Sequence, residues 1–385
     1  IFHKKIERWE RSKLIKNPDY IGREKEFKQI IDFFAEAQDR IGEKHYKPIV
    51  IGLRGNAGLG KSRFIYEFVQ NIKKNYKHEI KRFVVKGYTK SYAQAPYSLW
   101  ISLLKNYFGI SINATRKKTE EKFNQGFKRL SNNLKSNMQA KLKKNSTSLE
   151  FLLGIESSDI VVDRFNPDEV KTKLQAGIRI FLEATASLAN RNNFPLIVIL
   201  EDLHWIDKAS LDTFKYILTT LNNEERRKNK PFNNLFFLLS YRREFENIRE
   251  FQFRANFNEF ALKPLTKSDS VRMIESMLGN INSNNVLINK LLKNSEGNPF
   301  YIEEWIHSLI NENIIKQEAD KWQLNKSIED ISIPKTLNNL ILYKFDRMND
   351  NLKKLLQRAS VIGYSFLEQI LEEVEKKLGK NNDIN

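Results

Sequence analysis

The sequence contains no cysteine and no long apolar run. Without cysteine there are no disulfides, no thiolate zinc sites and no cysteine nucleophiles, so we expect a reduced, cytoplasmic compartment. The longest apolar run, Phe194 to Leu200, is far shorter than the roughly 18 residues that a membrane-spanning helix needs. We therefore expect no membrane partner. Because the chain begins with Ile1 rather than Met, we expect it to be part of a longer protein.

Acidic residues are too few to balance the basic ones. The 385 residues carry 65 Lys and Arg against 47 Asp and Glu, a formal net charge of +18. Residues 1–16 hold six basic and two acidic side chains, and residues 115–145 hold ten and two. The rest of the chain is close to balanced, so the charge does not imply a basic groove through the fold. With 41% hydrophobic residues, the chain can form two or three domains with cores.

Short apolar runs alternate with helical patterns over the first two thirds of the chain. The expected strands lie at 48–53, 81–86, 195–200, 235–240 and 258–262. Each run is continuous rather than alternating, as is typical of strands buried on both faces. Helical patterns such as 168–190 lie between them. Strands that alternate with helices predict an α/β fold with a parallel sheet and right-handed crossovers.

The chain is expected to divide into a leader (1–17), an α/β core (18–263), a helix-rich segment (264–311) and an incomplete, winged-helix-like segment (312–385). A basic insertion at 110–167 interrupts the core and is expected to be partly helical, with no chemistry assigned to it. After Pro264, helices are predicted at about 267–279, 285–294, 299–311, 334–347 and 350–360, with a hairpin at 313–325.

The sharpest motif is G-x-x-x-x-G-K-[ST], directly after the first predicted strand and directly before a helical pattern. It reads Gly55, Asn56, Ala57, Gly58, Leu59, Gly60, Lys61 and Ser62, and we expect these residues and the following Arg63 to contact the nucleotide. Glycines let such a loop curl until its N–H groups and the helix N-terminus point at phosphate oxygens. We expect Lys61 to reach the β- and γ-phosphates and the Ser62 hydroxyl to bind Mg²⁺. The alternative is a glycine-rich turn without a ligand.

Two acids follow the strand predicted at 195–200. Glu201 is placed to hold Mg²⁺ or its water, and Asp202 to polarise the attacking water. Adjacent strand residues point to opposite faces, so the two roles require the strand to end in a turn there. A solvated strand end is the alternative.

An arginine follows the strand predicted at 235–240. Arg242 is a candidate sensor of the γ-phosphate, because a guanidinium matches phosphate oxygens and stays protonated. Arg243 is nearly as good a candidate, and a surface arginine is the competing interpretation.

Weaker features complete the set. Ile21, Gly22 and Arg23 precede a helix and could approach the nucleotide base, or could form an ordinary helix start. Pro299, at the start of another helix, is also a candidate for contact with the nucleotide. The alternative is an ordinary helix start, because the fixed φ of proline suits a first helical turn. Trp205, Asp207 and His204 fit packing, helix capping and an unpaired histidine better than reacting groups.

Taken together, these motifs resemble the signal-transduction ATPases with numerous domains (STAND), in the branch with an origin-recognition-like AAA ATPase module. The resemblance rests on residues 22–24, 55–62, 201–207, 242 and 297–300. It implies the strand order 5-1-4-3-2, a helical lid that brings Pro299 to the base, and a winged helix. It also implies an ATP/ADP switch with Mg²⁺ and slow hydrolysis that uses Asp202, Lys61 and Arg242. Relatives carry a cyclase, kinase or helix-turn-helix effector and a helical-repeat sensor, so such parts are expected outside this chain.

Two other functions stay open. One is an AAA ATPase that grips DNA through the winged helix and the basic insertion, which steeply salt-dependent binding would favour. The other is a scaffold that holds ATP without hydrolysing it. The sequence does not identify the input signal or the output, and it leaves open whether ATP causes oligomerisation.

Overall fold

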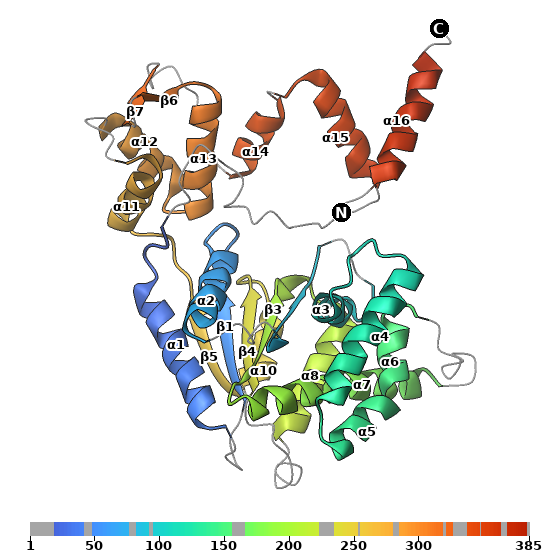
Figure 1. The fold of residues 1–385 in the computed structure, drawn as a ribbon. Helices are drawn as coiled ribbons and strands as arrows, with labels where there is room; N and C mark the ends of the chain where they lie inside the picture. Colours follow the sequence, from blue (N-terminus) through green and yellow to red (C-terminus); the bar gives the residue numbers. More distant parts are fainter. Residues whose placement is uncertain are drawn as a thin grey trace. The chain divides into compact units, whose positions relative to one another are not determined.

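The structure is a computed structural model, shown as a ribbon in Figure 1. It describes residues 19–41, 48–76, 82–91, 95–155, 166–222, 235–252, 255–279, 285–318, 321–325, 337–346, 348–362 and 368–382. The predicted leader, 1–17, lies outside them. The chain forms two compact units, an α/β unit from Arg23 to Lys263 and a C-terminal unit that begins at Pro264 and includes residues 19–22.

Five parallel strands form the sheet of the α/β unit. They are β1 (Ile49–Arg54), β2 (Val84–Tyr88), β3 (Leu196–Glu201), β4 (Leu235–Tyr241) and β5 (Asn256–Ala261). Their order is β2-β3-β4-β1-β5, which confirms the predicted α/β sheet and its strand order. Side chains of β3 and β4 are buried throughout, as their continuous apolar runs predict. The prediction 81–86 was wrong in its boundaries, because the second strand starts and ends later.

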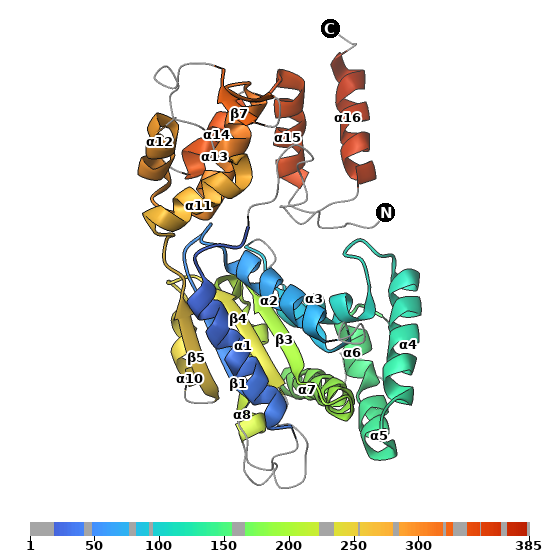
Figure 2. The same ribbon diagram turned by 60° about the vertical axis from the view of Figure 1, so that its left-hand side comes forward.

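Helices cover both faces of this sheet, as two neighbouring phenylalanines of β4 show. Phe236 packs against Phe34 of α1 (Glu24–Asp39) and Phe68 of α2 (Lys61–Asn75). Phe237 packs against Phe214 of α8 (Lys208–Asn222). Adjacent strand residues point to opposite faces, so α1 and α2 form one layer and α8 belongs to the other. Figure 2 shows α1 and α2 in front of the sheet.

The segment between β2 and β3 is helical. It contains α3 (Ser98–Phe108), α4 (Arg116–Asn132), α5 (Ser136–Lys144), α6 (Ser146–Leu152) and α7 (Pro167–Arg191). Phe108 of α3 contacts Phe123 of α4 and Phe181 of α7, so the basic insertion packs onto the core through aromatic rings. Residues 156–165 of the predicted insertion lie outside the described residues. A short connection, η5 (Glu246–Ile248) and α10 (Arg249–Gln252), joins β4 to β5.

The C-terminal unit is built mainly from helices. It contains α11 (Lys267–Leu278), α12 (Asn285–Ser295), α13 (Pro299–Asn311), α14 (Leu337–Asp346), α15 (Asp350–Ile362) and α16 (Glu368–Asn382). The antiparallel strands β6 (Ile315–Glu318) and β7 (Lys321–Leu324) lie within the segment predicted as a hairpin. Ile274, Ile302 and Trp305 lie in one apolar core with Trp322 of β7. None of the described helices is long and apolar enough to cross a membrane.

Candidate functional site

The glycine-rich loop connects β1 directly to α2. Gly58 has φ +82° and Gly60 has φ +90°, backbone conformations that favour glycine. Gly60 is the N-cap of α2, so its lack of a side chain leaves the first N–H groups of the helix uncovered by a capping group. The Gly55 N–H donates to the Tyr241 carbonyl oxygen at 3.2 Å, which fixes the start of the loop to the end of β4. The local backbone therefore has the form of an anion-binding loop.

Lys61 lies folded over this loop. Its Nζ donates to the carbonyl oxygens of Gly55 at 2.7 Å and Asn56 at 3.0 Å, and the residue is 8% exposed. Burial lowers the pKa of Lys61, and the charge of Asp202 partly opposes that shift. A buried ammonium that donates to neutral carbonyl groups gains strongly from an anionic partner such as a phosphate.

The remaining loop residues take different positions. Leu59 is 5% exposed and packs inward, while Ala57 lies in the turn between the glycines. Arg63 forms an ion pair with Glu67 at 2.6 Å and lies over the Tyr66 ring. Arg63 is therefore engaged along α2, and its predicted contact with nucleotide stays a prediction.

Ser62 and Glu201 meet at the carboxyl edge of the sheet. The Ser62 Oγ donates to Glu201 Oε2 at 3.0 Å, although 139 residues separate the two. Glu201 is the last residue of β3 and is 4% exposed. Its other oxygen forms an ion pair with Lys86 of β2. The two predicted metal ligands are thus in contact, and a basic side chain shares the carboxylate.

Asp202 begins a turn, as its predicted role requires. Its φ is +61°, in the left-handed region, and the 3-10 helix η4 (Leu203–Trp205) follows directly. The Asp202 N–H donates to Ser240 Oγ at 3.1 Å, and the Thr89 hydroxyl donates to the Asp202 carbonyl oxygen. Residues of β4 and just beyond β2 hold the backbone at Asp202 in this turn. The Asp202 carboxylate can therefore point in a different direction from that of Glu201.

Arg242 lies close to this turn. Its guanidinium lies over the Trp205 ring, 5.6 Å from the centroid, and its Nε is buried with no hydrogen-bond partner among the described residues. Burial, together with the charges of Arg242 and Lys61, lowers the pKa of His204 to about 4. His204 is therefore neutral at physiological pH, and Arg242 is near enough to Lys61 to affect its protonation. Arg243 is exposed.

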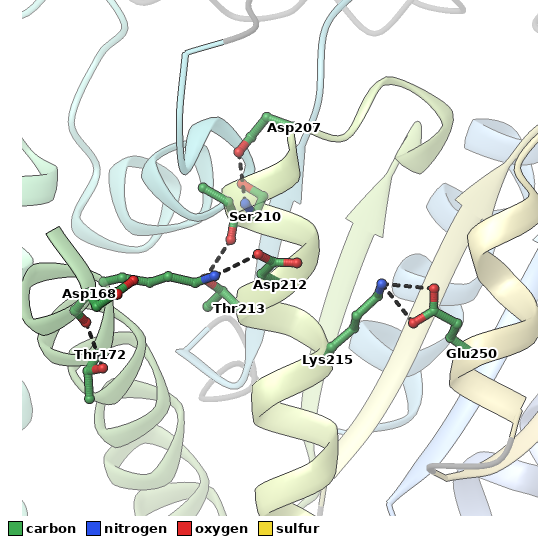
Figure 3. Close-up of polar contacts among 10 residues, drawn as sticks. Asp168, Thr172, Asp207, Ser210, Asp212, Thr213, Lys215 and Glu250 are labelled. Carbon is green, nitrogen blue, oxygen red and sulfur yellow. Dashed lines mark hydrogen bonds and ion pairs between the residues drawn. The ribbon is translucent and has the colours of Figure 1, made fainter.

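Asp207 joins two helices of the same layer. Its Oδ1 accepts from the Ser210 N–H at 2.8 Å, which caps α8, and from the Tyr97 N–H at 3.0 Å. Its Oδ2 accepts from the N–H and the hydroxyl of Ser98, the first residue of α3. Figure 3 shows Asp207 at the start of α8, with Lys215 of the same helix bonded to Glu250 of α10. Capping by Asp207 was expected, but its second partner at α3 was not.

The residues predicted near the nucleotide base divide between the two units. Arg23 is 8% exposed and donates to the Lys263 carbonyl oxygen within the α/β unit. Ile21 packs against the core of the C-terminal unit, and Gly22 has φ +76° beside Leu265. Pro299 is the first residue of α13, where the Asn298 side chain accepts from the N–H groups of the first turn. Base contacts by these residues stay predictions.

Three contributors to the site were missed at the sequence level. Thr89 follows the end of β2, Ser240 is the last but one residue of β4, and Lys86 lies in the middle of β2. Both strands are neighbours of β3. Because the carboxyl ends of parallel strands meet at one edge of the sheet, the strand order would have indicated Thr89 and Ser240, whereas Lys86 also required the register of β2 against β3.

The described residues contain no group of three or more His, Cys, Asp or Glu side chains that could hold a metal ion. Ser62 and Glu201 alone therefore offer few ligands. Mg²⁺ in proteins commonly takes one or two carboxylates, with its other ligands from water and substrate phosphates. The residues present fit a metal that arrives with a nucleotide.

Two of the similar solved structures are of the same protein. The Aeropyrum pernix ORC2 protein in its ADP form is 11% identical with a TM-score of 0.42, and 93% of this chain covers 81% of it. In its ADPNP-ADP complexes the identity is 12% and the TM-score is 0.40. That match covers 76% of this chain and 64% of the ORC2 chain, so this chain spans less than two thirds of it. The E. coli MS115-1 HORMA:CdnC:Trip13 complex gives 10% and 0.40, with coverages of 76% and 83%.

Two family models match the sequence itself. One, described as a domain of unknown function (DUF8739), matches residues 266–323. No curated protein matches the chain. The other model is described as an AAA ATPase domain and matches residues 20–228, which include β1, the glycine-rich loop and β3. Since this match spans more than half of the 385 residues, the chain belongs to the AAA ATPase domain family.

Proposed function

We propose that the chain binds Mg–ATP at the glycine-rich loop and hydrolyses it slowly. The observation that carries this proposal is the 3.0 Å contact between Ser62 Oγ and Glu201 Oε2, directly beside the left-handed turn at Gly58 and Gly60. A loop for phosphate and a carboxylate for the metal are thereby brought to one point from distant parts of the sequence. The match to an AAA ATPase domain supports the same assignment.

Each residue then has a defined role. The uncovered N–H groups of α2 and the Lys61 ammonium hold the β- and γ-phosphates. Ser62 and Glu201 would hold Mg²⁺, which would supply positive charge to neutralise developing charge on the phosphates. Asp202 orients and polarises the attacking water, and Arg242 leaves the Trp205 ring to contact the γ-phosphate. Ile21, Gly22, Arg23 and Pro299 border the base.

We further propose that hydrolysis resets a regulatory switch of the STAND type. In this proposal α11 to α13 act as a helical lid, and the segment from β6 onward as a winged-helix-like domain. ATP and ADP would then favour different arrangements of the two units. A fused effector and a helical-repeat sensor outside this chain would read and set that state, in a reducing compartment suited to a chain without cysteine.

Calorimetric titration with ATP and Mg²⁺ tests the binding site. Lys61→Ala removes a cation that is expected to make two charge-assisted bonds to phosphate, so we expect a loss of about 4 kcal/mol, or roughly 1,000-fold in Kd. Lys73→Ala is the matched control, because Lys73 is an exposed lysine in the last turn of the same helix. Equal heats from wild type and Lys61→Ala would refute the site.

A second candidate function is nucleic-acid binding through α4 and α5. The observation that favours it is a group of exposed basic side chains with no ion-pair partner among the described residues: Lys117, Lys118, Lys122, Lys128, Arg129, Lys135, Lys141, Lys143 and Lys144. Anisotropy of labelled duplex DNA over rising salt tests it, since contacts to several phosphates produce a steep salt dependence. A weak or salt-independent signal would exclude this function.

A further inference from the structure

Lys86 shares the carboxylate expected to hold the metal. It lies on β2, an edge strand that pairs with β3 in parallel, and its register partner is Ile199. Glu201 is two residues beyond Ile199 and therefore on the same face of the sheet. The Lys86 side chain reaches one pleat toward the carboxyl edge and ion-pairs with Glu201 Oε1. The contact thus follows from strand register.

The two oxygens of Glu201 have different partners, and only Oε2 accepts a hydrogen bond, because Oε1 is buried without a hydrogen-bond partner among the described residues. Oε2 accepts from Ser62 Oγ at 3.0 Å, and Oε1 faces the Lys86 ammonium. Glu201 is 4% exposed, and a carboxylate buried to this extent requires a positive or hydrogen-bonding partner. Lys86 supplies a positive charge where a cation bound to nucleotide would otherwise do so.

The Lys86 side chain itself is 41% exposed. Its flexible four-carbon stem can move the ammonium between Glu201 and solvent at little cost. A divalent cation that approaches Glu201 therefore meets a carboxylate that is already neutralised, and must displace the lysine. Without the metal, the same lysine keeps the carboxylate from repelling a phosphate.

We propose that Lys86 is a positioning residue that holds the Glu201 carboxylate in place of a metal cation and so makes nucleotide binding less dependent on Mg²⁺. This inference rests on the proposed function. It applies to the ratio of the nucleotide Kd in EDTA to the Kd in saturating Mg²⁺, which measures the coupling between metal and nucleotide.

The test measures this ratio with a fluorescent ATP analogue on the full chain. Lys86→Met removes the charge and keeps the stem, so metal-free binding weakens and metal-dependent binding tightens. We expect the ratio to rise about fivefold, the size of a partly exposed ion pair. Lys73→Met, at an exposed lysine in the last turn of α2, is expected to leave it unchanged. In a Glu201→Gln background, Lys86→Met should also leave it unchanged, because the carboxylate is gone.

The outcomes separate this inference from the function on which it rests. If wild type binds no nucleotide with or without Mg²⁺, the proposed function fails. If wild type and Lys86→Met bind nucleotide with equal ratios, only the role of Lys86 is overturned. If circular dichroism shows that Lys86→Met is unfolded, Lys86→Arg decides, because it keeps the charge. Its ratio should equal or fall below that of wild type, and a higher ratio would overturn the inference.

Discussion

The glycine-rich loop and the acidic end of β3 serve one proposed site but are built in different ways. Lys61 finds its partners five and six residues away, and the loop takes its shape from glycines within one short string. Glu201 finds Ser62 at a distance of 139 residues, and Asp202 is held by residues from β4 and from beyond β2. The first half depends on local backbone geometry, whereas the second depends on the order and register of three strands.

The largest effect expected at the acidic end is on turnover. Asp202→Asn keeps a residue that tolerates the left-handed backbone but removes the charge that polarises water. We expect hydrolysis to fall about 100-fold, as for loss of a general base, while ATP affinity stays unchanged. Single-turnover phosphate release and calorimetry measure the two quantities. If wild type itself releases no phosphate with Mg²⁺, the chain is an ATP-bound scaffold, and the acidic end would be structural only.

A smaller effect tests whether the acidic end depends on long-range bonds. Asp207→Ala removes the cap of α8 together with the acceptor for the start of α3. We expect the free energy of unfolding to fall by about 2 kcal/mol, at the upper end for a helix cap. Asp207→Asn should have an intermediate effect, because its one amide oxygen can still accept from the Ser210 N–H, whereas its NH₂ group cannot accept from the Ser98 N–H. Equal urea midpoints for wild type and Asp207→Ala would show that the turn does not depend on these long-range bonds. Local backbone geometry would then stabilise it, as in the glycine-rich loop.

The smallest effect concerns Arg242. Trp205→Leu removes the ring beneath the guanidinium, a contact of about 0.7 kcal/mol at an exposed position. Because the freed arginine costs less to move, we expect the preference for ATP over ADP to rise about threefold. Displacement titrations with both nucleotides measure this, and Trp205→Phe should stay near wild type. An unchanged or lower preference in Trp205→Leu would mean that Trp205 does not compete for Arg242.

The same contrast explains what the sequence could predict. The glycine string at 55–62 predicted its own local conformation, because φ and helix N-termini are set by neighbours in the chain. Five of the six helices described after Pro264 were placed within a few residues, since periodicity and the Asn298 cap are also local signals, whereas α16 was not predicted. The strand order came from a resemblance to known ATPases and was confirmed.

The pairing of Lys86 with Glu201 was beyond the sequence. Lys86 fell inside a predicted strand, 81–86, that in fact runs from Val84 to Tyr88. Its partner depends on β2 lying next to β3 and on a register that places Lys86 opposite Ile199. A shift of one residue would have turned the lysine to the other face. The partner of a charged side chain on a strand therefore cannot be predicted until the neighbouring strand and its register are known.

The left-handed backbone of Asp202 limits which residues can replace it without strain. Asn, Asp, His and Gly adopt this conformation readily, whereas β-branched and bulky residues are strained in it. Most single-codon changes at this position would thus be removed for their folding cost before their chemistry was ever tested. Diversification of this centre is expected to pass through asparagine or glycine, which keep the fold while they silence the reaction.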